Sequence, residues 1–158
     1  MSFKCTLQVA DKTFEVLECN VWLNQKFDKN GRPASGVQGG NIILLLEGSD
    51  DDTLGTWMAD PTKKQDGVIT FFRIDQDSKS KELEFKGGYA ITLIESFIAD
   101  DDVSMIPELE IATDDEQGRA KYSRILNFHR RTNNSYVIYF QISAQKIKVD
   151  GVEHDNRW

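Results

Sequence analysis

Apolar residues alternate with polar or small ones along most of this chain, and this period of two restricts its fold more than any other feature. Residues 3–9 read FKCTLQV, and a similar alternation resumes after Asp11-Lys12. Because successive side chains of a strand point to opposite faces, a half-buried strand requires such a pattern. We therefore predict that the chain begins with a β-hairpin that turns at Asp11-Lys12.

The second strand of this hairpin contains a change of phase. Its apolar residues fall on even positions up to Val16 and on odd positions from Leu17 through Leu23. One extra residue in a strand shifts the phase in this way and bends the strand. The pattern predicts a bulge near Val16-Leu17 in a long, bent strand.

Further strands are predicted by alternation or by continuous apolar runs. The run from Ile42 to Glu47 is almost entirely apolar, which indicates a central strand that is buried on both faces. The remaining predicted strands cover Gly67–Asp75, Lys81–Phe85, Tyr89–Phe97 and about Tyr136–Val149.

One short helix is predicted at about residues 52–60. Ser49 to Asp52 resembles a capping box, and Leu54, Trp57 and Met58 have the spacing of one apolar helix face. Asp60-Pro61 ends the helix, because proline cannot continue it. The predicted fold is mainly β, a small β-barrel or a two-sheet sandwich with this one helix.

The length of 158 residues predicts a single domain spanning 1–158. Within it, residues 99–134 lose the strand pattern, and an acidic stretch up to Glu116 precedes a basic one from Arg119. We predict that this segment leaves the barrel as a compact lobe and returns to the sheet near Tyr136; a disordered loop is the alternative. In the lobe, two apolar groups would pack together, the second spaced like a short helix: Met105, Ile106, Leu109 and Ile111 against Tyr122, Ile125, Leu126 and Phe128.

Charge and hydropathy exclude several classes of partner. The formal net charge is −7 and the isoelectric point is near 4.8, which opposes binding to nucleic acid. The longest apolar run, from Ile42 to Leu46, is far shorter than the ~20 residues that cross a bilayer. The first residues lead directly into a strand pattern and do not resemble a signal peptide. We expect a soluble protein that is made in the cytoplasm and is not inserted into membranes.

No pattern in the sequence predicts a catalytic, cofactor-binding or metal-binding residue. His129 and His154 lack partners at the spacing of a zinc site. Asp75-Gln76-Asp77 begins like a calcium loop, but the turn glycine and the bidentate glutamate of that loop are missing. Gly31 to Gly40 lacks the Gly-Lys-Ser/Thr of a phosphate loop, and no nucleophile elbow occurs. An enzyme is therefore not expected.

The cysteines and tryptophans have structural interpretations. A hairpin with one bulge would place Cys5 and Cys19 nearly opposite each other, so a disulfide is conceivable, although reduced and buried thiols are favoured. Trp22, Trp57 and Trp158 could line a ligand groove, but a place in the core or in a subunit interface is favoured.

The order of short sequence motifs along the chain resembles that of the tube protein of type VI secretion systems. This is the TssD or haemolysin-coregulated protein family, and the resemblance is to its Bacteroidetes-type branch. The resemblance covers MSFKCTLQVADKTFEVLECN, GRPASGVQGG, TLGTWMADP, GVITFF, KELEFKGGYAITLIESF and ISAQKIKVDGVEHDNRW. It implies a β-barrel subunit of hexameric rings that stack into a hollow tube. A contractile sheath would drive this tube out of the cell with its spike and effectors, which implies secretion without a signal peptide.

The resemblance also implies a role for the glycine-rich connection between Lys26 and Gly40, which the family uses in assembly. We expect it to contact the next ring through Arg32, Pro33, Ser35, Gly36, Val37, Gln38, Gly39 and Gly40. The segment 99–134 departs from the family pattern and is expected to be an insertion. Two alternatives stay open: a specialised relative whose insertion binds an effector or caps the tube, and an unrelated ligand-binding barrel.

Overall fold

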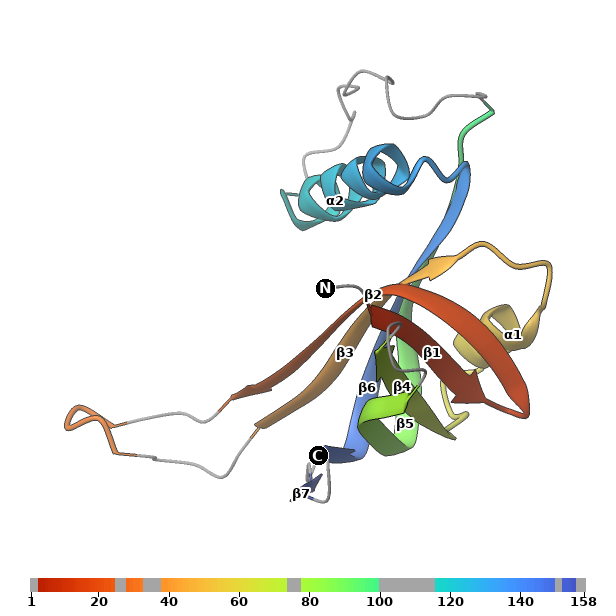
Figure 1. Cartoon of the computed structure of the whole chain (residues 1–158). Coiled ribbons are helices and arrows are strands. Elements are labelled where there is room, and N and C mark those ends of the chain that lie inside the picture. Colours follow the sequence, from red (N-terminus) through yellow and green to blue (C-terminus); the bar gives the residue numbers. More distant parts are fainter. Residues whose placement is uncertain are drawn as a thin grey trace.

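The computed structural model describes residues 3–24, 28–32, 38–73, 78–99, 116–149 and 152–155 (Figure 1). Seven strands and two helices lie in these ranges. The strands are β1 (Phe3–Val9), β2 (Lys12–Asn24), β3 (Gln38–Glu47), β4 (Gln65–Arg73), β5 (Ser78–Phe97), β6 (Tyr136–Val149) and β7 (Val152–Asp155), and the helices are α1 (Thr53–Ala59) and α2 (Glu116–Thr132).

Six of the strands close into an antiparallel barrel. Their order is β3-β2-β1-β4-β5-β6, and β3 also pairs with β6, which closes the ring of hydrogen bonds. The pairing of β3 with β6 covers Asn41–Glu47 on β3 and ends at Ser143 on β6. The strand β7 pairs with β6 beyond that point, from Lys146 to Val149. Of the predicted architectures, the barrel is confirmed and the sandwich is not.

The first hairpin confirms the predicted bulge and shifts the predicted turn by one residue. Val9 pairs with Lys12, so the turn is Ala10-Asp11, and both turn residues have positive φ, 51° and 60°. Positive φ at both central residues is typical of a type I′ turn, whose twist matches the twist of the two strands that it joins. In the pairing of β2 with β3, Val16 faces Leu46 and Glu18 faces Leu45, which leaves Leu17 as the bulged residue.

The barrel interior is filled with apolar side chains, and Trp57 of α1 closes it. The Trp57 ring lies 6.4 Å from the Phe85 ring and 5.2 Å from the Phe140 ring, between centroids. Its indole N–H donates to the carbonyl oxygens of Gly88, at 3.1 Å, and Lys63, at 3.2 Å. A helix of seven residues has little stability alone, so this burial must hold α1 in place.

The start of α1 differs from the predicted capping box. The side chain of Asp52, at the N-cap, makes no capping hydrogen bond. Asp51 accepts from the Thr53 N–H at 2.8 Å, and the Ser49 hydroxyl oxygen accepts from the Asp51 N–H at 3.1 Å. The polar residues therefore form two consecutive side-chain turns that lead into the helix.

The predicted strands 81–85 and 89–97 are one continuous strand, β5. The prediction of a break at Gly87-Gly88 was wrong, because β5 pairs with β6 on both sides of these glycines. Gly87 has φ +61°, and its N–H donates to the Asp66 carboxylate at 2.9 Å. A glycine pair here bends a strand without ending it, because glycine adopts positive φ without steric cost.

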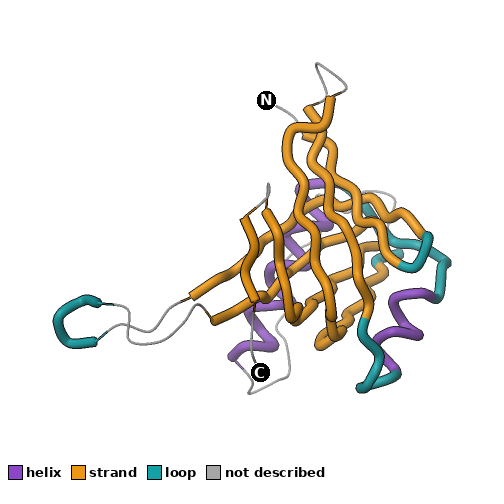
Figure 2. Tube along the Cα trace, turned by 90° about the horizontal axis from the view of Figure 1, so that it is seen from below, coloured by secondary structure: helices purple, strands orange, loops and turns teal. Residues whose placement is uncertain are grey.

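The strand β3 is buried on both faces, as predicted, and the second face lies under α2. Its side chains at 42, 44 and 46 enter the barrel interior, whereas Ile43 and Leu45 face outward. The outward pair forms a separate cluster with Val137 and Tyr139 of β6 and with two residues of α2, Ile125 and Phe128. The sequence predicted only a short helical stretch there. The helix has 17 residues and lies outside the barrel wall (Figures 1 and 2).

Candidate assembly surfaces

The strands β2 and β3 continue beyond the barrel as a two-stranded arm (Figures 1 and 2). Their pairing extends to Asn24 opposite Gln38, whereas the pairing of β3 with β6 begins only at Asn41. On the other side, the pairing of β2 with β1 ends at Val16. Within the described residues, β2 therefore has one open edge from residue 17 onward, and open edges are sites where another strand can pair.

The tip of the arm is a compact turn at residues 28–32. The Asp28 carboxylate accepts from the N–H groups of Asn30, at 2.9 Å, and Arg32, at 3.0 Å. The Asp28 N–H donates to the Arg32 carbonyl at 2.8 Å, and Gly31 has φ +78°. Asp28 thus organises a turn whose side chains are exposed.

The structure divides the residues that were predicted to contact the next ring. Arg32 lies in the tip of the arm, whereas Gln38, Gly39 and Gly40 belong to β3, so the prediction that these three lie in a loop was wrong. Gly40 shows why glycine suits a strand here: a Cβ on it would lie 2.6 Å from the Ala144 carbonyl oxygen. Four more of the predicted residues lie outside the described residues: Pro33, Ser35, Gly36 and Val37.

Apolar side chains are exposed where the arm leaves the barrel. Leu17, Trp22 and Leu23 of β2 are 38%, 52% and 42% exposed. Trp22 and Leu23 are neighbours in one strand, so they lie on opposite faces of the arm. Trp22 is out of phase with the apolar residues beside it in the strand, so the sequence set it apart from them. Leu23 has the same phase as the core residues before it, so the pattern contained no signal that it is exposed. Trp57 is a core residue, as favoured, and Trp158 lies outside the described residues.

A second exposed aromatic group lies where β5 ends and β6 begins. The Phe97 ring stacks on the Tyr136 ring with centroids 4.0 Å apart, and Phe97 is 67% exposed. The Tyr136 hydroxyl donates a hydrogen bond, with the Ser49 carbonyl and the Glu95 carboxylate both at 3.0 Å. Burial and the Glu95 carboxylate raise the pKa of Tyr136. Sequence reasoning missed this pair, because Phe97 follows the regular alternation of its strand.

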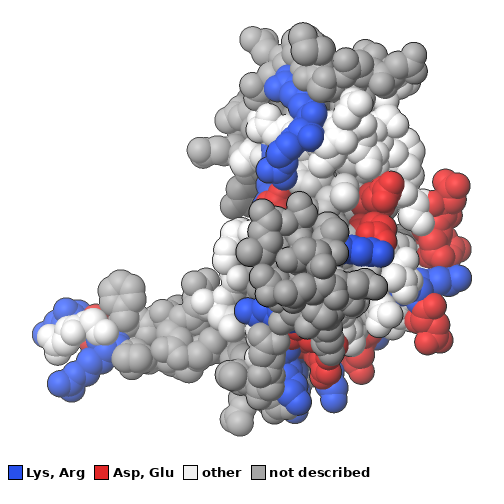
Figure 3. Space-filling view, viewed as in Figure 1, with Lys and Arg blue, Asp and Glu red and all other residues white. Residues whose placement is uncertain are grey.

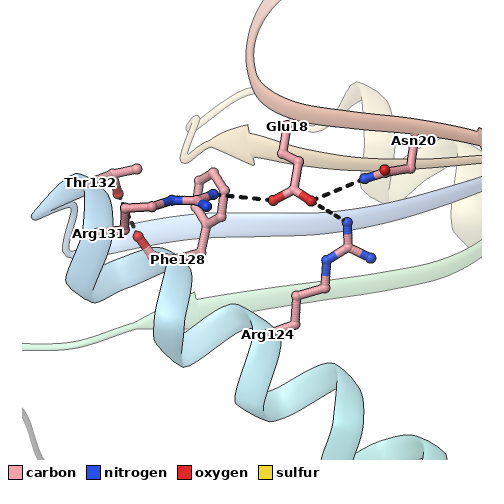
Figure 4. Close-up of polar contacts among 6 residues, drawn as sticks. All are labelled: Glu18, Asn20, Arg124, Phe128, Arg131 and Thr132. Atoms are coloured by element: carbon pink, nitrogen blue, oxygen red, sulfur yellow. Dashed lines mark hydrogen bonds and ion pairs between the residues drawn. The ribbon is translucent and has the colours of Figure 1, made fainter.

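The helix α2 is attached to the barrel by a polar clamp beside its apolar contact (Figure 4). The Glu18 carboxylate accepts from Arg124 at 2.5 Å with one oxygen and from Arg131 at 3.3 Å with the other. The Asn20 side chain donates to the same carboxylate at 3.0 Å. Burial raises the pKa of Glu18, but the hydrogen bonds from Arg124 and Asn20 and the charges of both arginines outweigh it, so the pKa lies below its usual value. The sequence could not predict this clamp, because its partners are more than 100 positions apart.

His129 ties the end of α2 to the barrel. Its ring is 1% exposed, with Nδ1 2.6 Å from the Asn134 carbonyl oxygen and Nε2 2.8 Å from the Ser96 hydroxyl. A carbonyl oxygen only accepts, so Nδ1 carries a hydrogen and donates it. His129 is therefore a buried packing residue. The side chain of His154 lies outside the described residues.

The cysteines are not opposite each other in the sheet, so that prediction was wrong. Cys5 pairs with Val16, and Cys19 pairs with Leu44 of β3, because β2 leaves β1 after the bulge. Both thiols are free, Cys5 is buried, and Cys19 packs against the barrel core. Burial raises the pKa of each thiol to about 12, which makes both unreactive near neutral pH.

Among the described residues, no group of three or more His, Cys, Asp or Glu side chains is placed to hold a metal ion. Neither α1 nor α2 is long and apolar enough to span a membrane. Asp75-Gln76-Asp77, which begins like a calcium loop but lacks the residues that complete one, lies outside the described ranges.

Comparison with known proteins identifies similar sequences and folds. The family model for hemolysin coregulated protein Hcp (TssD) matches residues 1–115. Hcp1 from Flavobacterium johnsoniae is 27% identical, with a TM-score of 0.71 over 97% of this chain and 99% of that one. A comparison with curated proteins found no match.

Two more distant structures share the fold alone. A mutated Hcp1 from the E. coli EAEC 042 pathovar is 9% identical, with a TM-score of 0.60 over 100% of this chain and 99% of that one. A chain of the sheath/tube terminator of the extracellular contractile injection system PVC is 12% identical, with a TM-score of 0.51 over 93% of both chains.

Proposed function

We propose that this chain, which belongs to the hemolysin coregulated protein Hcp (TssD) family, is the inner-tube subunit of a type VI secretion apparatus. The family match over residues 1–115 is the observation that carries this proposal. In the proposed tube, copies of the chain form hexameric rings, and the rings stack. The tube would contact a contractile sheath and a baseplate with its spike, and it would deliver effectors. The chain would be made in the cytoplasm and would leave the cell through the apparatus itself.

Two features of the structure support assembly with further copies. The open edge of β2 offers backbone groups to a neighbouring strand, and a closed ring lets every copy use this edge in the same way. The exposed Trp22 and Leu23 place apolar surface on both faces of the arm. A two-stranded ribbon cannot bury such side chains alone, so assembly would cover them.

The barrel itself has a structural role in this proposal, and we expect no catalytic activity. Its interior is filled by side chains that are fully buried, among them Leu7, Phe85, Phe140 and Ile142. Side chains therefore occupy the space that a ligand-binding barrel would reserve for a ligand. The work of the molecule would be done by its outer surface.

The test is light scattering and negative-stain electron microscopy of the purified chain. We expect particles of six times 18.0 kDa that appear as rings, and tubes at high protein concentration. Trp22→Asp should reduce assembly strongly while leaving the barrel folded, because Trp22 is half exposed in the subunit. Lys4→Asp, at an exposed position of β1, is the matched control and should assemble normally. A wild-type chain that stays monomeric at high concentration would refute the proposal.

The role of the arm in stacking requires a separate experiment. We propose that the tip at residues 28–32 and the residues beside it contact the next ring, so replacing residues 25–37 with a tight turn should leave rings and abolish tubes. Tubes of normal length from this variant would exclude the arm as the stacking element.

The interpretation of residues 99–134 as an insertion that this family generally lacks also stays a prediction. Deletion of this segment should leave rings intact.

A further inference from the structure

A groove of about 410 Å³ lies between α2 and Glu18 of β2. Figure 4 labels four of the residues that line it, Glu18, Arg124, Phe128 and Arg131. On the helix side its lining includes one stripe of α2, Ala120, Arg124, Asn127 and Arg131, which are spaced four, three and four residues apart. On the other side lies Glu18 of β2. Phe128 also lines the groove, and together with Ile125 it forms the neighbouring stripe that holds α2 to the barrel.

The groove is basic although the protein is acidic. The helix contains five basic residues and one acidic residue, a net charge of +4. The rest of the chain therefore carries −11, which gives the net charge of −7 for the whole chain. Figure 3 shows a band of Lys and Arg over the region of α2 and acidic side chains on the side of α1. In the groove itself, two guanidinium groups face one carboxylate, which leaves an excess of positive charge.

Glu18 shows which ligand chemistry the groove accepts. Its two oxygens bond to different arginines, so one carboxylate bridges side chains two helical turns apart. Each guanidinium has five N–H donors in a planar fork that suits carboxylates. The Arg131 side chain is 68% exposed, and its bond to Glu18, at 3.3 Å, is the longer of the two. A carboxylate from another molecule could therefore reach Arg131 and replace Glu18 there.

We propose that this groove is a docking site for an acidic peptide segment of a protein partner, in which Glu18 acts as an internal competitor. Carboxylates of the segment bind Arg131 and then Arg124, and Glu18 turns away toward solvent or toward Asn20, which already donates to it. The small Ala120 side chain leaves space for the backbone of the segment.

The test measures binding of a fluorescein-labelled glutamate-rich peptide to the full-length chain by fluorescence anisotropy. Arg131→Gln should weaken binding by about tenfold, the effect of losing one hydrogen bond between charged groups. Glu18→Gln should have the opposite effect and tighten binding several-fold, because the competing charge is gone. Added salt should weaken all of these complexes, because their attraction is electrostatic.

The chain offers matched controls in a second ion pair. Lys4 and Glu15 are exposed residues of β1 and β2 whose charged atoms lie 3.7 Å apart, and neither lines the groove. Lys4→Gln controls for the loss of one positive charge, and Glu15→Gln for the loss of one negative charge. Both should bind the peptide like the wild type.

Several outcomes would overturn the proposal. If Arg131→Gln binds no more weakly than Lys4→Gln, the groove is not the site. If Glu18→Gln binds no more tightly than Glu15→Gln, Glu18 is not a competitor. If a single-stranded oligonucleotide of equal charge binds as tightly and is equally sensitive to Arg131→Gln, the groove is a general anion site. Electron microscopy of the same samples reports on rings separately, so a failure here can be told from a failure of the tube proposal.

Discussion

The two helices pack against the same barrel in different ways. The helix α1 has seven residues and inserts Trp57 into the main core, where the ring contacts Phe85 and Phe140. The helix α2 has 17 residues and covers a small separate cluster on the outside of the wall, with ion pairs to Glu18 at its margin. The shorter helix is thus part of the core. The longer one is an attachment whose exposed stripe remains available for binding.

The comparison predicts that the largest loss of stability comes from α1. Trp57→Ala should lower the free energy of unfolding by about 3–5 kcal/mol, because it leaves a cavity beside Phe85 and Phe140 and removes a donor from the Gly88 carbonyl. Chemical denaturation followed by circular dichroism measures this. Trp57→Phe retains most of the volume and should cost clearly less. A small effect of Trp57→Ala would show that α1 is not part of the core.

The corresponding change in α2 should be smaller and local. Phe128→Ala removes the largest apolar side chain of α2 from the outer cluster and a ring over which Arg131 lies at 4.9 Å. We expect a loss of about 2–3 kcal/mol, since the cluster is small and at the surface. Hydrogen exchange should show faster exchange in α2 with little change in the barrel strands. If the barrel amides exchange faster to the same extent, the two helices do not differ as proposed.

The sequence predicted α1 better than α2 for a physical reason. The stripe of Leu54, Trp57 and Met58 and the stop at Pro61 are local signals, so α1 could be placed within one residue of its bounds. The helical spacing of Ile125 and Phe128 was also visible. The acceptor face on the barrel was not, because Ile43 and Leu45 belong to a run that is apolar on both faces.

The candidate surfaces were only partly predictable for a similar reason. The glycine-rich composition predicted a long connection between strands, but the pairing of Gln38–Gly40 within β3 depends on the close approach of Gly40 to Ala144, which local pattern does not encode. The bulge at Leu17 was visible as a change of phase. The open edge that follows it depends on where β1 ends relative to β2, and the clamp at Glu18 joins residues from opposite ends of the chain.

A third change tests the polar attachment of α2 to β5. His129→Ala leaves the Ser96 hydroxyl and the Asn134 carbonyl, which are partly buried, without their partner. We expect a loss of about 1–3 kcal/mol in the free energy of unfolding, the cost of unsatisfied buried groups. Thermal denaturation at constant pH measures it. The exposed Asn127→Ala of the same helix is the control and should have little effect on the free energy of unfolding.

The smallest expected effect is that of Glu18→Gln, and its dependence on pH identifies its cause. The pKa of Glu18 is lowered in the folded protein, so its ion pairs stabilise the fold above the ordinary value of 4.5 and lose this contribution as the pH falls through the folded value. Because the pair is partly exposed and screened, the contribution near pH 7 should be at most about 1 kcal/mol. The difference in melting temperature between wild type and Glu18→Gln should therefore be small at pH 7 and vanish in acid. Hydrogen exchange in α2 should respond more than that in α1, because only α2 contacts Glu18. A difference that persists unchanged below the folded pKa would mean that Glu18 acts through packing and not through its charge.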